Sequence, residues 1–476
     1  MGQEIEQAAF SASDHTEFRA RLRHETATLK RWFDTSAFAH AAPPTTGLEL
    51  EAWLIDPNHL PAPDNAAFLA AVDDPQVVFE LSKFNFELNV DPQVMDPHFL
   101  ERTHDALEEL WRRCERTAQQ MGLGVVATGI LPTVRDEMLQ LSWMSDSERY
   151  RALNQEVMRL RGGVPLSIDI EGQDRLTYQC DHIMLEAACT SLQAHLQVNQ
   201  VEAVRFYNAS LIAAAPLVAI SANSPYLFGK SLWAETRIPA FEQSTALHGF
   251  VDGEGRQVRR VTLGTSYLRH SMLELFLENL SYPALLPALS DDTAQLPHLR
   301  LHNGTIWRWV RPIVGFSGDG APHLRLENRV MPAGPTILDS IANLAFYFGL
   351  VLEWGRQETP LETVVSFEDA RANLYACAKN GLDAQIEWQG RKVDVQSLLL
   401  EHLLPQAKSA LARAGVDGGT IEYYLDYVLR PRLISGLNGA HWQRSFVECE
   451  GPNFQAMLER YVALQSAGNP VHTWTI

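Results

Sequence analysis

The stretch Gly47-Leu48-Glu49-Leu50-Glu51-Ala52-Trp53 alternates apolar and acidic side chains, which predicts a β-strand with one buried face and one polar face. Because strand side chains alternate, Glu49 and Glu51 share the polar face. At roughly 3.3 Å of rise per residue, their carboxylates start about 6.6 Å apart and can converge on a cation. An ordinary strand with two charges facing solvent explains the same pattern, so this stretch alone leaves both interpretations open.

A second predicted strand, Phe84–Val90, carries Glu87 on its polar face and follows another acid, Glu80. The two acids are an odd number of residues apart, so one unbroken strand would place them on opposite faces. They can meet at one site only if the chain turns or bulges near Ser82–Lys83. The alternative is one exposed glutamate on each side.

A third predicted strand, Leu192–Asn199, has a polar face made of Gln193, His195, Gln197 and Asn199. A polar face without Lys, Glu or Thr is unusual for a solvated surface. It suits a site where imidazole and amide groups hold a cation or a ligand. A single histidine is more often structural, so His195 by itself does not decide between these roles.

The fourth predicted strand, His323–Val330, places Arg325, Glu327 and Arg329 on one face. A ladder of salt bridges between strands would explain this mixture of charges. The alternative is a metal-binding carboxylate beside arginines that bind phosphate, since Arg can hold phosphate through two parallel hydrogen bonds.

Together the four strands carry five glutamates, one histidine and two of these arginines on polar faces. Oxygen-rich metal sites with nearby arginines are what phosphoryl transfer from ATP requires. The sequence contains no glycine-rich phosphate-binding loop. A nucleotide would therefore be held through metals and side chains.

The composition is that of a folded protein with an acidic surface. The 476 residues include 58 acidic and 39 basic side chains, a net charge of −19, and 46% are hydrophobic. This excludes disorder as the main state and makes nucleic acid an unexpected partner. Five scattered cysteines indicate reduced thiols. The acidic amino terminus does not fit a signal peptide, and the longest apolar run, Ala209–Ala222, contains Pro216 and is short for a membrane span. We expect a cytoplasmic protein with no membrane contact.

The order of the predicted elements indicates an α+β protein with an antiparallel or mixed sheet. We expect an N-terminal helical segment at residues 1–45, a sheet-containing domain at 46–360 and a helical region at 361–476 packed on that domain. Further strands are expected at Gly124–Thr128 and Thr305–Arg311. Expected helices are Pro97–Met121, Asp146–Arg161, Gln200–Ile220, Tyr267–Asn279, Thr336–Trp354, Ser366–Lys379, Val395–Ala414, Gly419–Leu433 and Pro452–Ser466.

The ordered set of motifs resembles the glutamate–cysteine ligase family of the carboxylate–amine ligase type. The similarity is carried by Gly47–Glu51, Glu80 with Glu87, His195 and Glu327-Asn328-Arg329, and further by Ala222–Lys230, Trp233–Arg237 and Asn438–Arg444. The resemblance implies a glutamine-synthetase-like sheet with helices packed on one face and a helical C-terminal part. It covers residues 45–350 well and the remainder more loosely.

The resemblance also implies roles for individual residues. Two or three Mg²⁺ ions around ATP, which is the co-substrate, would be held by Glu49, Glu51, Glu80, Glu87, His195 and Glu327. Arg329 and Arg311 would be catalytic, and Gln197, Lys230 and Arg237 would bind ATP or substrate. Gln197 departs from the second histidine found in some members, which leaves its role near the nucleotide open.

The activity implied is ligation of the γ-carboxylate of glutamate to an amine, with cysteine as the family default, through an acyl phosphate. The partners would be small molecules, and a homo-oligomer is possible. A different amine acceptor and a catalytically silent ligand-binding relative remain alternatives. A silent relative is disfavoured because crowded carboxylates without bound cations cost stability. A sandwich whose polar faces meet water predicts Lys and Thr on those faces, which are nearly absent.

Overall fold

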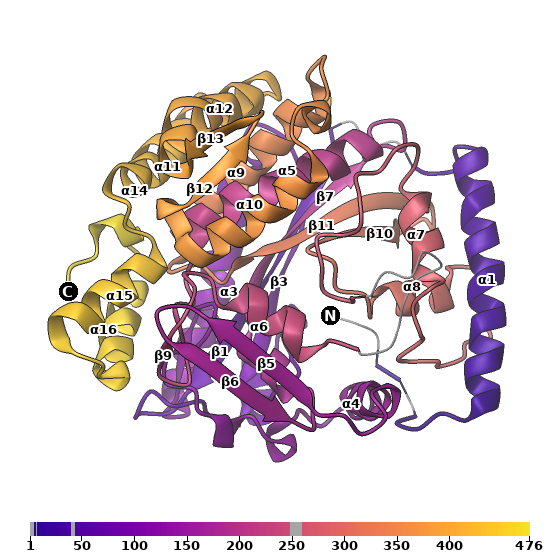
Figure 1. Cartoon of the computed structure of the whole chain (residues 1–476), viewed down its shortest axis with the longest axis horizontal. Helices are drawn as coiled ribbons and strands as arrows, with labels where there is room; N and C mark the ends of the chain where they lie inside the picture. Colours follow the sequence, from indigo (N-terminus) through magenta and orange to yellow (C-terminus); the bar gives the residue numbers. More distant parts are fainter. Residues whose placement is uncertain (1–3, 6, 40–42, 248–258) are drawn as a thin grey trace.

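A seven-stranded antiparallel sheet forms the centre of the molecule (Figure 1). The computed structural model describes residues 4–5, 7–39, 43–247 and 259–476. The strand order is β10-β11-β7-β1-β3-β2, and β4 pairs with the end of β1. The strands of this sheet are β1 (Thr45–Ile55), β2 (Val77–Phe79), β3 (Asn85–Val94), β4 (Gly124–Val126), β7 (Ser191–Val198), β10 (Val310–Phe316) and β11 (Pro322–Pro332).

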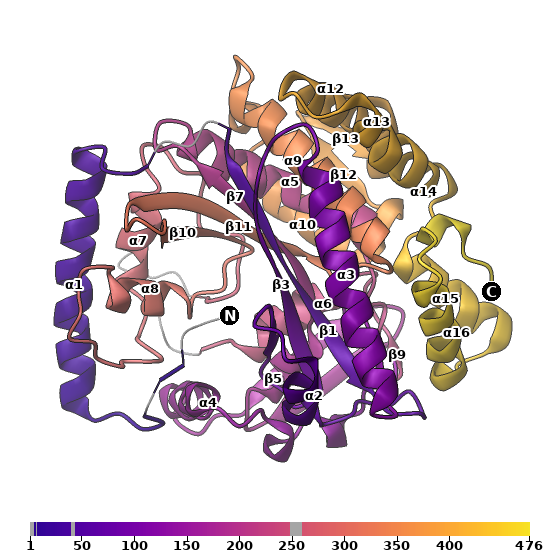
Figure 2. The same ribbon diagram turned by 180° about the vertical axis from the view of Figure 1, so that it is seen from behind.

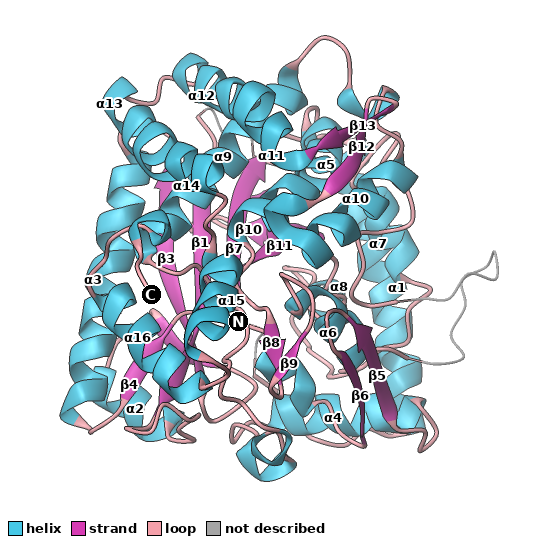
Figure 3. Ribbon diagram, turned by 60° about the vertical axis from the view of Figure 1, so that its left-hand side comes forward, coloured by secondary structure: helices cyan, strands magenta, loops and turns pink. Residues whose placement is uncertain are grey.

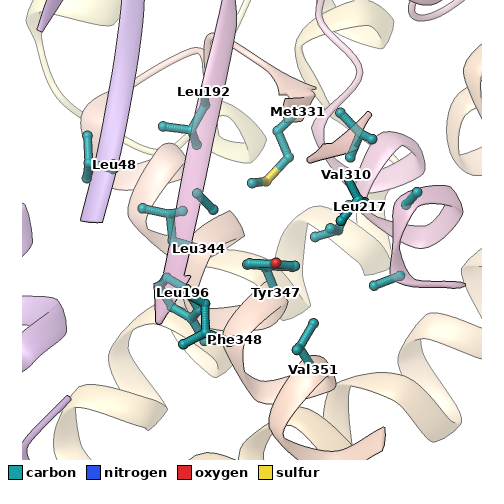
Figure 4. Packing of buried hydrophobic residues seen from close by; sticks show 14 of the residues in the cluster. Leu48, Leu192, Leu196, Leu217, Val310, Met331, Leu344, Tyr347, Phe348 and Val351 are labelled. Carbon is teal, nitrogen blue, oxygen red and sulfur yellow. The ribbon is translucent and has the colours of Figure 1, made fainter. Parts of the chain in front are cut away.

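The alternation predicted for the central strand is confirmed. Leu48, Leu50 and Ala52 of β1 are buried in the main hydrophobic core, whereas Glu49 and Glu51 lie on the opposite face. The neighbouring strand contributes Leu192 and Leu196 to the same apolar face, where Tyr347 and Phe348 pack against them (Figure 4). The sheet therefore has one dry face and one polar face.

Two long apolar helices cover the dry face. These are α5 (Ala203–Ser221) and α9 (Ile337–Arg356), and α3 (Phe99–Gln120) packs beside them over β3 (Figure 2). By length and composition alone, α5 and α9 are apolar enough to cross a membrane. In their most apolar stretches, 89% of α5 and 94% of α9 is buried inside the protein, so they are core helices of this fold.

The polar face of the sheet is also covered, which corrects the expectation of helices on one face only. The helices on this side are α1 (Ala12–Asp34), α4 (Glu148–Leu160), α7 (Leu273–Asn279) and α8 (Pro297–Asn303) (Figure 1). α1 is tied to α8 by a buried pair, since His298 Nδ1 lies 2.6 Å from Glu25 Oε1 and the Leu299 N–H donates to Glu25 Oε2 at 2.8 Å. These segments enclose space above the polar strands.

The helices after Arg356 form a C-terminal group in which α10 packs on α5 and α12 packs on α9 (Figure 3). A buried ion pair anchors them, because Arg432 donates to Asp339 Oδ1 at 2.7 Å and Asp339 also accepts from the Val471 N–H at 3.0 Å. The helices are α10 (Phe367–Asn380), α11 (Val395–Leu398), α12 (Leu404–Arg413), α13 (Gly418–Ile421), α14 (Arg430–Ser435), α15 (Gly439–Glu450) and α16 (Phe454–Ser466).

Several elements differ from the sequence expectations. The strand expected at Thr305–Arg311 instead begins at Val310 and contains Pro312, which an edge strand tolerates because one side needs no N–H donor. The expected helix Tyr267–Asn279 is helical only from Leu273. Elements not predicted are α2 (Asn65–Val72), α6 (Arg237–Ser244), β2, α8, α15 and the hairpins β5–β6 (Leu166–Glu171, Arg175–Cys180), β8–β9 (Tyr226–Leu227, Lys230–Ser231) and β12–β13 (Gln385–Trp388, Arg391–Asp394).

Candidate active site

A cavity of about 380 Å³ lies between the polar face of the sheet and the helices that cover it. Its floor comes from β1, β3, β7, β10 and β11, and its walls from α4, α7 and α8. Seven of the eleven residues proposed as site residues line it: Glu49, Glu51, Glu80, Glu87, Arg311, Glu327 and Arg329.

The structure brings the two pairs of predicted carboxylates together. Glu51 on β1 stands directly opposite Glu87 on β3 in the antiparallel register. The turn required near Ser82–Lys83 is present, because the Asn85 N–H donates to the Ser82 carbonyl at 3.1 Å and β2 returns antiparallel to β3. This turn places Glu80 in the same cavity wall. Like charges opposed across a strand pair are destabilising, so the arrangement calls for cations.

Burial and mutual repulsion raise the pKa values of three of these acids. Burial, followed by the charges of Glu49 and Glu51, raises the pKa of Glu87 to about 7. Burial and the charges of Glu87 and Glu51 hold the pKa of Glu80 well above its usual value. Burial also raises the pKa of Glu51, although Arg329 opposes that effect. A bound dication would remove this cost by stabilising the charged forms.

Glu49 lies in a different environment from the other acids of β1 and β3. Burial alone would raise its pKa, but the nearby His195 outweighs burial and holds the pKa of Glu49 well below its usual value. His195 Nε2 lies 3.1 Å from Glu49 Oε1. His195 is only 7% exposed, and its Nδ1 has no hydrogen-bond partner among the described residues.

An orphaned imidazole beside buried carboxylates fits a metal-binding donor set. Within the described ranges, no group of three or more His, Cys, Asp or Glu side chains is arranged to hold an ion. His195 does not line the cavity itself and reaches it through Glu49. The chemistry of the donors thus fits Mg²⁺.

Two arginines hold Glu327 at the other side of the cavity floor. Arg311 donates to Glu327 Oε2 at 2.7 Å and Arg329 Nε donates to Oε1 at 3.0 Å. Burial opposes ionisation, but these two guanidinium groups dominate and lower the pKa of Glu327 to about 2. Arg329 also donates to Gln193 Oε1 at 2.8 Å, and Gln193 Nε2 donates to Glu51 Oε1 at 2.9 Å. One network therefore connects the arginines to the carboxylates of β1.

The end of the cavity near β10 is basic and aromatic. Arg300, Arg325 and His323 line it together with Phe316, over whose ring the Arg300 guanidinium lies at 5.5 Å. A Cβ at Gly315 would lie 2.4 Å from His323 Nε2, so a larger residue here would displace the His323 ring. The cavity therefore has an acidic end and a basic end, which suits a ligand that carries phosphates.

The sequence interpretation missed several residues that line the cavity. Arg149 and Tyr150 come from α4, and the Tyr150 hydroxyl lies 3.4 Å from Glu80 Oε2. Glu186 comes from a short 3-10 helix, η3 (Met184–Ala188). No periodic pattern marks these residues, because they reach the cavity from elements outside the sheet. Arg325 also lines the cavity, and strand alternation could have identified it as a site residue, because it shares the polar face of Glu327.

Three residues proposed for ATP or substrate do not line the cavity. Lys230 is exposed on the β8–β9 hairpin. Gln197 lies farther along β7, opposite Arg325, and is also absent from the cavity wall. Arg237 is 1% exposed and donates to the carbonyls of Arg329 and Val330, where β11 bulges away from β7. Its observed contacts fix the backbone beside Arg329.

Family comparison assigns the chain to a class of enzymes. The model of the family described as Glutamate-cysteine ligase family 2 matches residues 45–472, so the chain belongs to this family. It is accordingly an ATP-dependent ligase of the carboxylate–amine type. No protein with a curated function matches the sequence.

Two solved structures resemble the fold. One is the glutamate–cysteine ligase of Francisella tularensis in complex with AMP, with a TM-score of 0.52, 10% identity and coverage of 89% of each chain. The other is a bifunctional glutathione synthetase from Pasteurella multocida, with a TM-score of 0.51 and 13% identity. The match to the latter covers 89% of this chain and 52% of the Pasteurella chain, about half of its length. At these identities the likeness concerns the fold.

The raised pKa of Glu87 predicts how stability depends on pH in the absence of metal. A carboxyl with a raised folded pKa contributes stability below its unfolded pKa, and this contribution is lost as the pH rises through the folded value, here about 7. In EDTA, wild type should therefore lose stability between pH 5 and pH 8. Glu87→Gln should lose less, by on the order of 1–3 kcal/mol at pH 8.

Urea unfolding at both pH values measures this difference. Glu171→Gln, on the exposed end of β5, is the control and should follow wild type. An equal loss of stability in wild type and Glu87→Gln would show that Glu87 does not titrate in the folded protein as the geometry requires.

Proposed function

We propose that this enzyme joins the γ-carboxylate of glutamate to the amino group of cysteine, with consumption of ATP and a requirement for Mg²⁺. The observation that carries the proposal is the cavity floor, where carboxylates at one end are connected through Gln193 to an Arg-Glu-Arg cluster at the other. The family match supports the ligase class. Cysteine as acceptor, Mg²⁺ and the individual roles below belong to the proposal.

We assign three roles to the residues of the cavity: binding metal ions, binding the nucleotide, and stabilising the charge on the γ-phosphoryl group. Glu49, Glu51, Glu80, Glu87, His195 and Glu327 would hold two or three Mg²⁺ ions, which when bound would neutralise phosphate charge. The basic end near Arg300 and Arg325 would receive the rest of the nucleotide. Arg329 and Arg311, already fixed by Glu327, would face the γ-phosphoryl group as charge develops on its oxygens.

The chemistry follows from the low reactivity of a carboxylate toward an amine at neutral pH. The glutamate carboxylate attacks the γ-phosphorus of ATP, so a C–O–P linkage forms and ADP leaves. The amine then attacks the acyl carbon, a C–N bond forms and inorganic phosphate departs with one oxygen of the original carboxylate. The nitrogen loses a proton in this second step.

The products test this sequence directly. With glutamate, cysteine, ATP and MgCl₂ we expect ADP and phosphate in equal amounts, and ¹⁸O from labelled glutamate carboxylate should appear in phosphate. AMP with pyrophosphate would instead indicate an acyl adenylate and contradict the proposal. The same phosphate-release assay over a panel of amino acids decides whether another amine is the acceptor.

Further properties are proposed on the same basis. The sheet would be of the glutamine-synthetase type, with residues 46–360 as the catalytic domain, flanked by segment 1–45 and the helical region 361–476. The β12–β13 hairpin interrupts that last region. One hydrophobic cluster includes residues from all three segments, from Phe18 to Leu433. We also propose a cytoplasmic enzyme of glutathione biosynthesis that takes small-molecule substrates and could assemble as a homo-oligomer.

A further inference from the structure

One acidic side chain of the cavity is neither part of the sheet nor held by a cation. Glu186 projects from η3, the turn that leads into β7, and lines the cavity wall. Within the described part of the chain, its carboxylate has no hydrogen bond or salt bridge. Glu327, by contrast, is held by two arginines. Glu186 is therefore a carboxylate of the cavity wall that could accept a cationic group of a ligand.

The surroundings of Glu186 limit which cation can pair with its carboxylate. Arg329 is near, but two of its nitrogens already donate to Glu327 and Gln193. Tyr150 also lies close enough to feel the charge of Glu186, and Leu153 of the same helix lines the cavity. Mg²⁺ demands a near-octahedral set of oxygens, whereas an ammonium group needs only one carboxylate and a few acceptors.

We propose that Glu186 binds the amino group of the amine substrate in its ammonium form and thereby selects cationic amines as acceptors. The bound ammonium then loses one proton to water, and the neutral nitrogen attacks the acyl carbon. This inference rests on the proposed ligase function and adds to it a residue that determines specificity. The sheet carboxylates would hold the metals, while Glu186, on η3 outside the sheet, would hold the acceptor. No residue of the sheet offers an equally unpaired carboxylate on that wall.

Steady-state kinetics of Glu186→Gln test the proposal, with L-cysteine as the amine. The variant keeps the shape of the side chain and removes its charge. We expect the KM for L-cysteine to rise about tenfold or more, since hydrogen bonds to a charged group are roughly twice as strong as neutral ones. The KM for ATP and the MgCl₂ requirement should not change. Hydroxylamine, which is largely uncharged at pH 7, should still give the hydroxamate at the wild-type rate.

Three controls keep the result interpretable. Glu137→Gln, on another short 3-10 helix outside the cavity, should behave as wild type. Glu186→Asp retains the charge and should give an intermediate KM. Calorimetric titration requires no turnover: L-cysteine should bind wild type about tenfold more tightly than Glu186→Gln, whereas 3-mercaptopropionate, which lacks the amino group, should bind both equally.

Several outcomes would overturn the assignment. An unchanged KM for L-cysteine, or a rise in the KM for glutamate alone, would remove Glu186 from the acceptor site. A higher MgCl₂ requirement with loss of hydroxamate formation would make Glu186 a metal ligand. Absence of ATP turnover by wild type with every amino-acid pair would refute the proposed function, while the calorimetric difference between wild type and Glu186→Gln would still decide the role of Glu186.

Discussion

Replacing Glu51 with glutamine should abolish ATP turnover, with a loss of at least about 1000-fold in kcat, and Glu49→Gln should do the same. Each change removes one negative charge and keeps the shape of the side chain. Glu51 stands at the centre of the polar network, where it accepts from the Ser191 N–H at 2.6 Å and from Gln193 at 2.9 Å. The remaining amide oxygen can keep one of these bonds, so the fold should persist.

Melting temperatures measured with and without MgCl₂ separate metal binding from structural damage. Mg²⁺ should raise the melting temperature of wild type, since a ligand that binds only the folded state stabilises it. The rise should be smaller in both variants. In EDTA, Glu51→Gln should be at least as stable as wild type, because it relieves the repulsion between Glu51 and Glu87. Glu49→Gln should be less stable, because it removes the charge that pairs with His195. Glu171→Gln should keep full turnover. An equal Mg²⁺-induced rise in wild type and both variants would show that Glu49 and Glu51 are not ligands.

The second large effect is expected at Arg329, where lysine should lower kcat by at least about 100-fold with little change in nucleotide affinity. Arg329 bridges two partners, Glu327 at 3.0 Å and Gln193 at 2.8 Å, and lines the cavity. Lysine preserves the charge but loses the planar fork that can serve both partners and a phosphoryl oxygen. The loss should appear in kcat, because charge spreads over the phosphoryl oxygens in the transition state.

The alternative role for Arg329 was a salt-bridge ladder on the protein surface. The burial of its partner Glu327, which is only 1% exposed, argues against this alternative. Arg175 provides the matched control. It donates two hydrogen bonds to Asp169 across the exposed β5–β6 hairpin, at 2.8 and 2.7 Å. Arg175→Lys should change stability by less than about 1 kcal/mol and leave turnover normal. Near-normal kcat in Arg329→Lys would refute its placement at the phosphoryl group.

Sequence periodicity was sufficient for the parts of the site that lie on regular strands. Alternation in Gly47–Trp53 placed Glu49 and Glu51 on one face, and the odd spacing of Glu80 and Glu87 required the turn that the structure contains. Lys230 and Arg237 were chosen from the family resemblance and not from periodicity, and neither lines the cavity. A motif indicates which residues accompany one another in a family, but not which side chain points into the site.

The sequence by itself determined the two faces of the sheet and the acidic, metal-fitting character of one of them, because side-chain alternation is a local property of an extended chain. Tertiary structure decided which charges meet. The pairing of β7 between β1 and β11 brings His195 to Glu49 and connects Arg329 to Glu51 through Gln193. Contacts of this kind join residues more than a hundred positions apart, and strand register decides which residues meet. Burial in the folded protein then shifts the pKa of each acid. Glu186 reaches the cavity from η3, an element outside the sheet, which no local pattern encodes.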